Sequence, residues 1–212
     1  MWKKTFLLVT CVFCLVLSSC IDIFQHLTRD ASGVDRNSIK VTASKTIFAM
    51  ANGVSDDNID YEKLFDESST VDIKEYNQFN ATINKINDVM DIGYLINMNI
   101  DYRDRSLVNQ INRSNTGFIP RYNGKNIIIH IDCLGGNSGS TDDNAMAAAL
   151  LATGKYRLLI NKKCIANIEK VSIKTYEGET SINFLDLYDE YLVEIPIPII
   201  FVSDVDLIIY SK

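Results

Sequence analysis

The residues best suited to chemistry lie in a glycine- and serine-rich loop that follows an apolar stretch. This loop carries Asn137, Ser138 and Ser140, with Gly139 between the two serines. A serine hydroxyl becomes a nucleophile when a base lies within hydrogen-bond reach and an acid orients that base. The three polar side chains therefore form a candidate loop site, whose chemistry depends on which partners the fold brings to it.

Residues 136–140, Gly-Asn-Ser-Gly-Ser, are similar to the nucleophile segment of glutamyl-endopeptidase-type serine proteases. The similarity implies a small hydrolase that uses Ser138. The sequence departs from that family in two respects: the upstream His26 lacks the family's surrounding segment, and an Ala-rich helix is expected where the family has a strand. Phosphate binding at the helix start is disfavoured because Asp142 and Asp143 repel anions. We therefore interpret the loop as a solvent-facing connection and expect no catalytic residue.

Metal binding is also disfavoured by the spacing of the candidate ligands. A site like that of von Willebrand A domains requires Asp-x-Ser-x-Ser at the strand end, whereas an insertion separates Asp132 from Ser138. Neither Cys133 nor Cys164 belongs to a Cys-x-x-Cys pair, and the only two histidines, His26 and His130, are far apart in the sequence. In an exported protein the two cysteines form either a disulfide or two buried thiols. We expect no metal and no cofactor.

The first twenty residues have the anatomy of an export signal. Two lysines precede an apolar run over residues 6–17, which is too short to span the roughly 30 Å hydrocarbon core of a bilayer. Residues 17–20, Leu-Ser-Ser-Cys, resemble the lipobox of bacterial lipoproteins. That resemblance implies cleavage before Cys20 and attachment of lipid to its sulfur, so that a palmitate-type anchor holds the mature protein on a membrane. The composition, rich in Ile, Asn, Lys and Asp, resembles that of spirochaetal lipoproteins.

Removal of residues 1–19 leaves 193 of the 212 residues and changes the formal net charge from −6 to −8, because the leader contains two lysines and no acids. A net negative chain without a Lys/Arg cluster is a poor binder of nucleic acid. We expect residues 20–37 to form a lipidated tether and residues 38–212 a single globular domain. By analogy with enterobacteria, Ile21 after the cysteine favours the outer membrane.

Hydrophobic periodicity predicts two main helices packed on a multi-stranded sheet. Apolar residues at three- and four-residue spacing predict a helix over residues 72–91, and an Ala-rich segment predicts another over residues 142–153. Alternation predicts a half-buried strand over residues 94–103, and a continuous apolar run predicts an interior strand over residues 125–133. The expected fold is α+β or mixed α/β. A β-sandwich with helical insertions is the alternative.

The run from 125 to 171 reads as strand, loop, helix and strand, which is typical of a parallel β-α-β crossover. It resembles the repeating unit of the TolB N-terminal domain, the curli-secretion protein CsgG and the penicillin-binding-protein activator LpoB. The step at residues 153–159, Thr-Gly-Lys-Tyr-Arg-Leu-Leu, carries the resemblance. It implies an envelope lipoprotein that works by protein contact, as an activator or secretion partner. The sequence departs from the pattern where 165–176 turns strand-like.

These observations predict a lipid-anchored cell-envelope lipoprotein that acts as a non-catalytic binding or assembly module. Its expected partners are the membrane, through the lipid on Cys20, and one or more proteins. The activator or secretion partner is the first alternative. A small serine hydrolase is the second.

Overall fold

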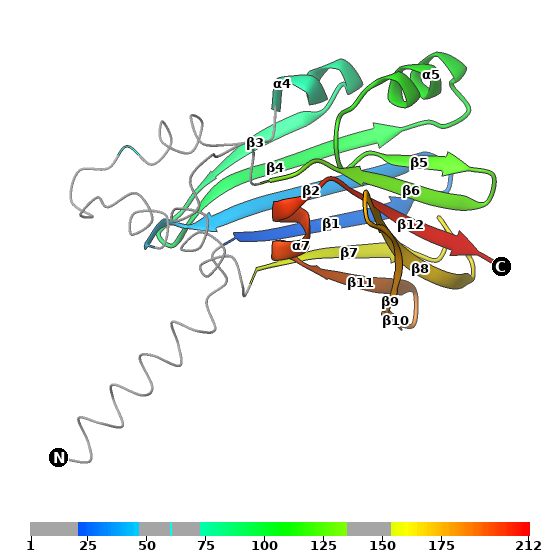
Figure 1. Ribbon diagram of the computed structural model, residues 1–212. Coiled ribbons are helices and arrows are strands. Elements are labelled where there is room, and N and C mark those ends of the chain that lie inside the picture. Colours follow the sequence, from blue (N-terminus) through cyan, green and yellow to red (C-terminus); the bar gives the residue numbers. More distant parts are fainter. Residues whose placement is uncertain (1–20, 47–59, 61–72, 135–153) are drawn as a thin grey trace.

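The computed structural model describes residues 21–46, 60, 73–134 and 154–212, and within them the chain is mostly β (Figure 1). The strands are β1 (Ile21–Arg29), β2 (Asp35–Ser44), β3 (Thr82–Asn87), β4 (Asp91–Ile100), β5 (Pro120–Asn123), β6 (Asn126–Ile131), β7 (Lys155–Asn161), β8 (Ile168–Thr175), β9 (Gly178–Ile182), β10 (Phe184–Asp186), β11 (Glu190–Pro196) and β12 (Val205–Ser211). The helical elements are α4 (Ile73–Tyr76), the 3₁₀ turn η2 (Asn77–Phe79), α5 (Arg105–Arg113) and α7 (Ile197–Val202).

The strands form two sheets. The larger has the order β10-β11-β7-β1-β2-β4-β3, and the smaller has the order β5-β6-β12-β8-β9. Strand β1 lies in the middle of the larger sheet, where it pairs antiparallel with β2 and parallel with β7, whereas the other pairings among these strands are antiparallel. Segments more than 120 residues apart in sequence therefore meet at β1.

The core lies between the two sheets, because alternate residues of the central strands are buried on the facing sides. Ile23 and Leu27 of β1 are fully buried, as are Ile127 and Ile129 of β6. Each of these side chains removes apolar surface from water, which is the main driving force for folding. The packed interior thus consists largely of isoleucine, leucine and valine.

A buried polar network joins the sheets inside this apolar core. The amide of Gln25 donates to Asn37 Oδ1 at 2.7 Å and to the carbonyl of Phe118 at 2.8 Å. Asn37 Nδ2 donates to the same carbonyl at 3.0 Å, and the hydroxyl of Tyr156 donates to Gln25 Oε1 at 2.6 Å. Phe118 has a φ of 58°, a left-handed conformation that presents its carbonyl to both amides. Buried amides are tolerated here because their hydrogen bonds are satisfied.

The register gives the larger sheet two distinct ends. Ile21 pairs with Ala43 at one end, which we call the Ile21 end, and Arg29 pairs with Asp35 at the other, the Arg29 end. Asp35 in turn pairs with Ile100 of β4. The eight residue steps from Ile21 to Arg29, at about 3.3 Å each, separate the ends by roughly 26 Å. Helix α5 follows the Arg29 end, and α7 lies at the Ile21 end (Figure 1).

The predicted α+β or mixed α/β fold with two main helices is wrong. Of the predicted helix 72–91, residues 73–79 form only the short α4 and η2, after which Asn80 adopts a left-handed φ of 53°. The chain then continues as the edge strand β3, because its backbone groups pair with those of β4. The predicted helix 142–153 lies outside the described residues.

Two further expectations differ from the structure. The segment 20–37 was predicted to be a tether, yet 21–29 forms the central strand β1 and β2 begins at Asp35. The expected parallel crossover between 125–133 and the following strand is also wrong, because β6 belongs to the five-stranded sheet and β7 to the seven-stranded sheet. The parallel partner of β7 is β1.

The predicted strand over residues 94–103 is confirmed by β4, in which Tyr94, Ile96 and Met98 are buried. The predicted interior strand 125–133 is confirmed by β6, which pairs with β5 on one side and β12 on the other. Among the described residues, the helices are all too short or too polar to cross a bilayer.

Candidate functional site

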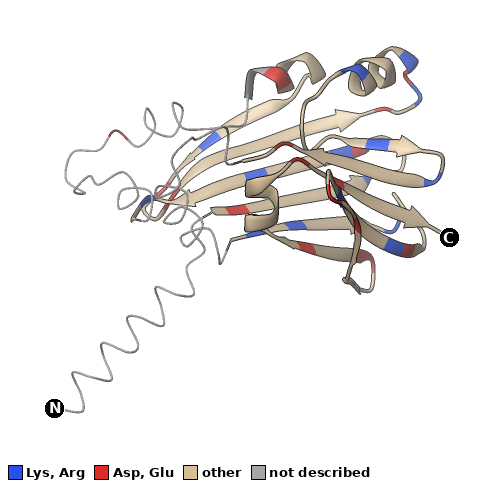
Figure 2. Cartoon of the chain, in the orientation of Figure 1, with Lys and Arg blue, Asp and Glu red and all other residues tan. Residues whose placement is uncertain are grey.

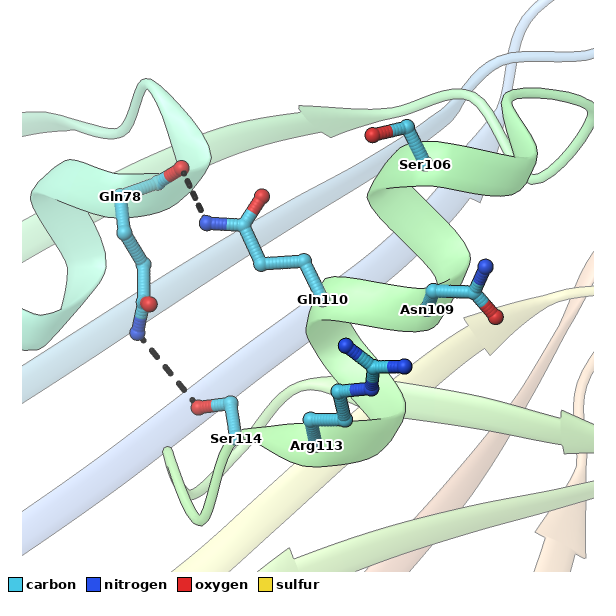
Figure 3. A pocket seen from close by; sticks show the side chains of 6 residues that line it. All are labelled: Gln78, Ser106, Asn109, Gln110, Arg113 and Ser114. Atoms are coloured by element: carbon cyan, nitrogen blue, oxygen red, sulfur yellow. Dashed lines mark hydrogen bonds between the residues drawn. The ribbon is translucent and has the colours of Figure 1, made fainter.

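A polar cleft lies between η2 and α5, on the side of the molecule where the Arg29 end of the sheet lies. Its volume is about 460 Å³. Six polar side chains line it, and they are drawn in Figure 3: Gln78, Ser106, Asn109, Gln110, Arg113 and Ser114. Because all six are polar, the cleft suits a hydrophilic ligand or the polar side chains of a protein partner.

Local sequence signals position the helix that forms one wall of the cleft. The Asp104 carboxylate caps the start of α5 by accepting from the backbone N–H groups of Ser106 at 2.8 Å and Leu107 at 3.3 Å. The apolar side of the helix is fixed by Ile111, which is buried, whereas Asn109 and Arg113 are exposed. The helix therefore presents a polar face to the cleft and to solvent.

The opposite wall is held by aromatic side chains. Tyr76 and Phe79 are buried under α4 and η2, and the Tyr76 hydroxyl donates to the carbonyl of Gly117 at 2.9 Å. Burial raises the pKa of Tyr76, so this phenol stays protonated and keeps donating. The anchored turn holds Gln78 at the cleft, where its carbonyl accepts from Gln110 Nε2 at 3.2 Å.

A chain of hydrogen bonds forms the floor of the cleft. Gln78 Nε2 donates to Thr116 Oγ1 at 3.2 Å and lies 3.5 Å from Ser114 Oγ. The Thr116 hydroxyl donates to the Glu75 carboxylate at 2.9 Å, and Arg121 donates to the Ser114 carbonyl at 2.7 Å. These bonds tie the floor of the cleft to α4 and β5, and the rim of the cleft is formed by α5.

The cation at the rim is the Arg113 guanidinium, for which no ion pair or hydrogen bond with a described residue is present; Figure 3 shows it beside Asn109 and Ser114, without a bond to the other five residues drawn. Asn109, one helical turn earlier, offers an amide on the same side. A guanidinium fork matches the two oxygens of a carboxylate or a phosphate. The arrangement can therefore hold an anionic group between an arginine and neutral donors.

The candidate residues named from the sequence lie apart from this cleft. Cys20 and the loop residues Asn137, Ser138 and Ser140 fall outside the described residues, so the structure says nothing of their surroundings.

Cys133 and Cys164 are both free thiols in the structure, where Cys133 is half-buried and Cys164 is buried. The Cys133 thiol donates to the Phe201 carbonyl at 3.0 Å, and the Cys164 thiol lies 3.7 Å from the Leu27 carbonyl. Burial, with the nearby Asp35 carboxylate, raises the pKa of Cys164 to about 12.

Each histidine lies beside carboxylates in the structure. His26 Nε2 is 2.7 Å from Glu190 Oε1, while His130 lies 2.7 Å from Asp206 and 3.2 Å from Asp132. The His26–Glu190 pair spans β7, which lies between β1 and β11, whereas His130 contacts Asp206 on the paired strand β12 and Asp132 just beyond the end of β6. Within the part of the chain that the structure describes, no cluster of three or more His, Cys, Asp or Glu side chains could hold a metal ion.

A second polar cluster closes the Arg29 end between the sheets. The Arg29 guanidinium holds the buried Asp35 carboxylate through two hydrogen bonds of 2.5 and 3.0 Å. The Tyr122 hydroxyl donates to Asp35 Oδ2 at 2.6 Å and accepts from Arg29 at 2.9 Å. Burial and the adjacent carboxylate raise the pKa of Tyr122, and the ion pair with Asp35 raises the pKa of Arg29. All partners are mutually satisfied, so this cluster is structural.

Sequence reasoning missed the cleft. No element was predicted from the sequence between residues 103 and 125, although Asp104 before Arg105 is a helix N-cap signal. The other wall comes from 73–79, which the helix prediction joined to the following strand. Neither segment carries a recognisable motif, because the cleft uses common polar residues from two separate elements.

The comparisons with known proteins give one distant structural likeness. No family model matches the sequence, and no curated protein is detectably similar to it. The fold is similar to that of the folded domain of the LppM protein of Mycobacterium tuberculosis, with a TM-score of 0.41, 9% sequence identity and 91% of each chain covered. At this level the likeness assigns no function.

Proposed function

We propose that this protein is a lipid-anchored cell-envelope lipoprotein that acts as a non-catalytic binding module, with the α5 cleft as its contact site. The observation that carries the proposal is the position of Ile21, which follows the lipobox cysteine directly and begins the central strand of the sheet. A lipid on Cys20 would hold the Ile21 end of the sheet at the membrane. The cleft would then face away from the bilayer, beside the other end.

The anchor is tested by metabolic labelling with a palmitate analogue. Wild-type protein is expected to incorporate the label and to fractionate with membranes, because two or three acyl chains give stable anchoring. The Cys20→Ala variant should lose the label. Equal labelling of both proteins would rule out acylation at this sulfur. Protease treatment of intact cells then distinguishes a surface protein from one on the periplasmic face of the outer membrane.

The partner of the cleft is expected to be a protein that offers a carboxylate to Arg113. A photo-crosslinking amino acid at Asn109 should give a discrete crosslinked product in cells, and Arg113→Glu should abolish that product by repelling the partner's acid. A crosslinker at Thr82, exposed on the edge strand β3, is the matched control. The proposal of a specific site would be contradicted if both positions gave the same crosslinked products, or if the product from Asn109 were unchanged in Arg113→Glu.

A narrower alternative is that the protein is an activator or a secretion partner. In that case it should co-purify with a murein synthase or with a component of a secretion machine. The hydrolase alternative predicts labelling by a serine-directed probe that disappears in Ser138→Ala. Neither alternative gains support from the described residues, since β6 and β7 lie in different sheets and the loop itself lies outside them.

A further inference from the structure

The Ile21 end of the larger sheet carries exposed apolar side chains on both sides of β1. Val89 and Met90, in the turn between β3 and β4, are 91% and 64% exposed. Ile199 and Val202 of α7 are 36% and 74% exposed. We call these four residues the apolar rim. Among the described residues, the other exposed large apolar side chains lie in β10 and in the turns beside β9 and β10: Tyr176, Leu185, Leu187 and Tyr188. Apolar side chains that gather at one place mark a contact surface, whereas single ones are ordinary.

The register places both halves of the rim at the same end. The β3–β4 turn lies just beyond the pair of Asn87 with Ile92, and Ile92 pairs with Ala43, the partner of Ile21. On the other side of β1, a side chain added at Gly154 would lie 2.7 Å from the Ile21 carbonyl.

A backbone hydrogen bond joins Gly154 directly to α7. The backbone N–H of Ile197, the first residue of α7, donates to the Gly154 carbonyl at 2.9 Å. The sheet order therefore puts Ile21 between the β3–β4 turn and α7 (Figure 1).

Helix α7 is apolar along its whole length. Its six residues, Ile-Pro-Ile-Ile-Phe-Val, carry no charge, and Figure 2 shows the helix without any Lys, Arg, Asp or Glu. Ile197 and Ile200 are buried in the core, whereas Ile199 and Val202 point away from it, three residues apart. Apolar side chains on the outer face of such a helix can enter the boundary between headgroups and acyl chains.

From this arrangement we infer that the apolar rim rests on the lipid bilayer that the acylated Cys20 enters. The inference rests on the proposed anchoring at Cys20. No spacer separates the lipidated residue from the sheet, since one peptide link of about 3.8 Å joins Cys20 to Ile21. The occupant of the rim is therefore a lipid surface, and the domain stands on it with its strands directed away from the membrane plane. The contact is apolar, so it needs no anionic lipid.

The test uses tryptophan as a depth probe. The chain has one tryptophan, Trp2 in the leader, so the mature protein provides a silent background. Val89→Trp and Val202→Trp are purified in the lipidated form and placed in phosphatidylcholine vesicles with chains brominated near the headgroup. Tyr188→Trp is the matched control, because Tyr188 is 93% exposed and lies near Glu190, which pairs with Asn161 at the opposite end of β7.

Both rim probes should lose roughly half of their fluorescence in brominated vesicles, and Tyr188→Trp should lose none. Adding Met90→Asp to Val202→Trp should restore fluorescence, whereas adding Leu185→Asp should not. Equal quenching of rim and control probes in protein that floats with the vesicles would overturn the inference while leaving the anchor intact. Failure of the wild-type protein to float or to carry lipid would overturn both the anchoring and the inference.

Discussion

At the Ile21 end of the larger sheet the chain closes with the uncharged α7, whereas at the Arg29 end it closes with a buried ion pair and the polar helix α5. The same strands run through both ends, so their residue types change from apolar to polar within about nine positions. The Ile21 end offers exposed isoleucine, valine and methionine, whereas the Arg29 end offers amides, hydroxyls and an arginine without a described partner at the cleft, together with exposed Leu187 and Tyr188 beside β11. The two ends therefore expose different residue types, and our proposals assign a lipid surface to the Ile21 end and a polar partner to the cleft beside the Arg29 end.

The largest expected effect comes from breaking the ion pair at the Arg29 end. Asp35→Ala leaves the partly buried Arg29 guanidinium without its carboxylate, which should lower the free energy of unfolding by about 3–5 kcal/mol in denaturant titration. Asp101→Ala removes an exposed partner of Arg103 and should leave stability nearly unchanged. Equal losses in the two variants would show that Asp35 does not close this end of the core.

A steric change tests the Ile21 end. Gly154→Ala would place a Cβ 2.7 Å from the Ile21 carbonyl and 2.9 Å from Ile197 Cγ1, so β1 or α7 must move. Overpacking of this kind should cost about 1–3 kcal/mol in the same titration. Lys155→Ala, one residue later and partly exposed, should cost less. An unchanged free energy of unfolding in Gly154→Ala would indicate that α7 is not packed tightly against β1.

The reactivity of the Cys133 and Cys164 thiols tests how well each end of the sheet is closed. Cys133 is half-buried beside α7, whereas Cys164 is buried beside the end of β1 with a pKa near 12. At pH 8 the Cys164 thiolate fraction is about one in ten thousand, so a disulfide reagent should modify Cys133 first and Cys164 only after unfolding. Rapid modification of both thiols in the folded protein would mean that the Arg29 end opens.

The same thiol gives a pH dependence. Unfolded Cys164 ionises near its ordinary pKa of 9.0, whereas the folded thiol does so near 12. The folded state therefore binds more protons in this window, and the contribution of Cys164 to stability is fully present below pH 9 and is lost as the pH rises toward 12. Stability measured between pH 8 and 11 should fall less steeply in Cys164→Ala than in the wild type.

The smallest effect on stability is expected in the cleft. Arg113→Ala removes an exposed side chain without a described partner, so the free energy of unfolding should change by no more than about 0.5 kcal/mol. The crosslink from Asn109 should nevertheless weaken. A large loss of stability would assign Arg113 to the fold instead of to a partner.

Prediction from sequence succeeded where burial follows a simple period. Residues 94–103 alternate between apolar and polar, and β4 buries Tyr94, Ile96 and Met98 as that pattern predicts. It failed for 72–91, where Ile83 and Ile86 lie three apart in the exposed edge strand β3. An edge strand with little burial has weak alternation, so chance helical spacing can dominate the pattern.

The cleft could not be predicted because its walls are distant in sequence. Gln78 and Gln110 meet only after β3 and β4 have been paired, and a backbone carbonyl takes part in their contact. Polar residues of this kind are common on any surface. Their assembly into a site is a property of the tertiary structure.

The sequence by itself predicted a leader with a lipobox cysteine. It also determined those strands whose inward positions are all apolar, because burial of apolar side chains drives folding and leaves a periodic pattern in the sequence. The tertiary structure alone decided that β1 and β2 belong to the core. Their inward positions include Gln25, Asp35 and Asn37, which look like solvent-facing residues in a sequence. Burial of these groups is tolerated only when partners from other strands satisfy them, and those partners, such as Tyr156 and Tyr122, come from distant segments of the chain.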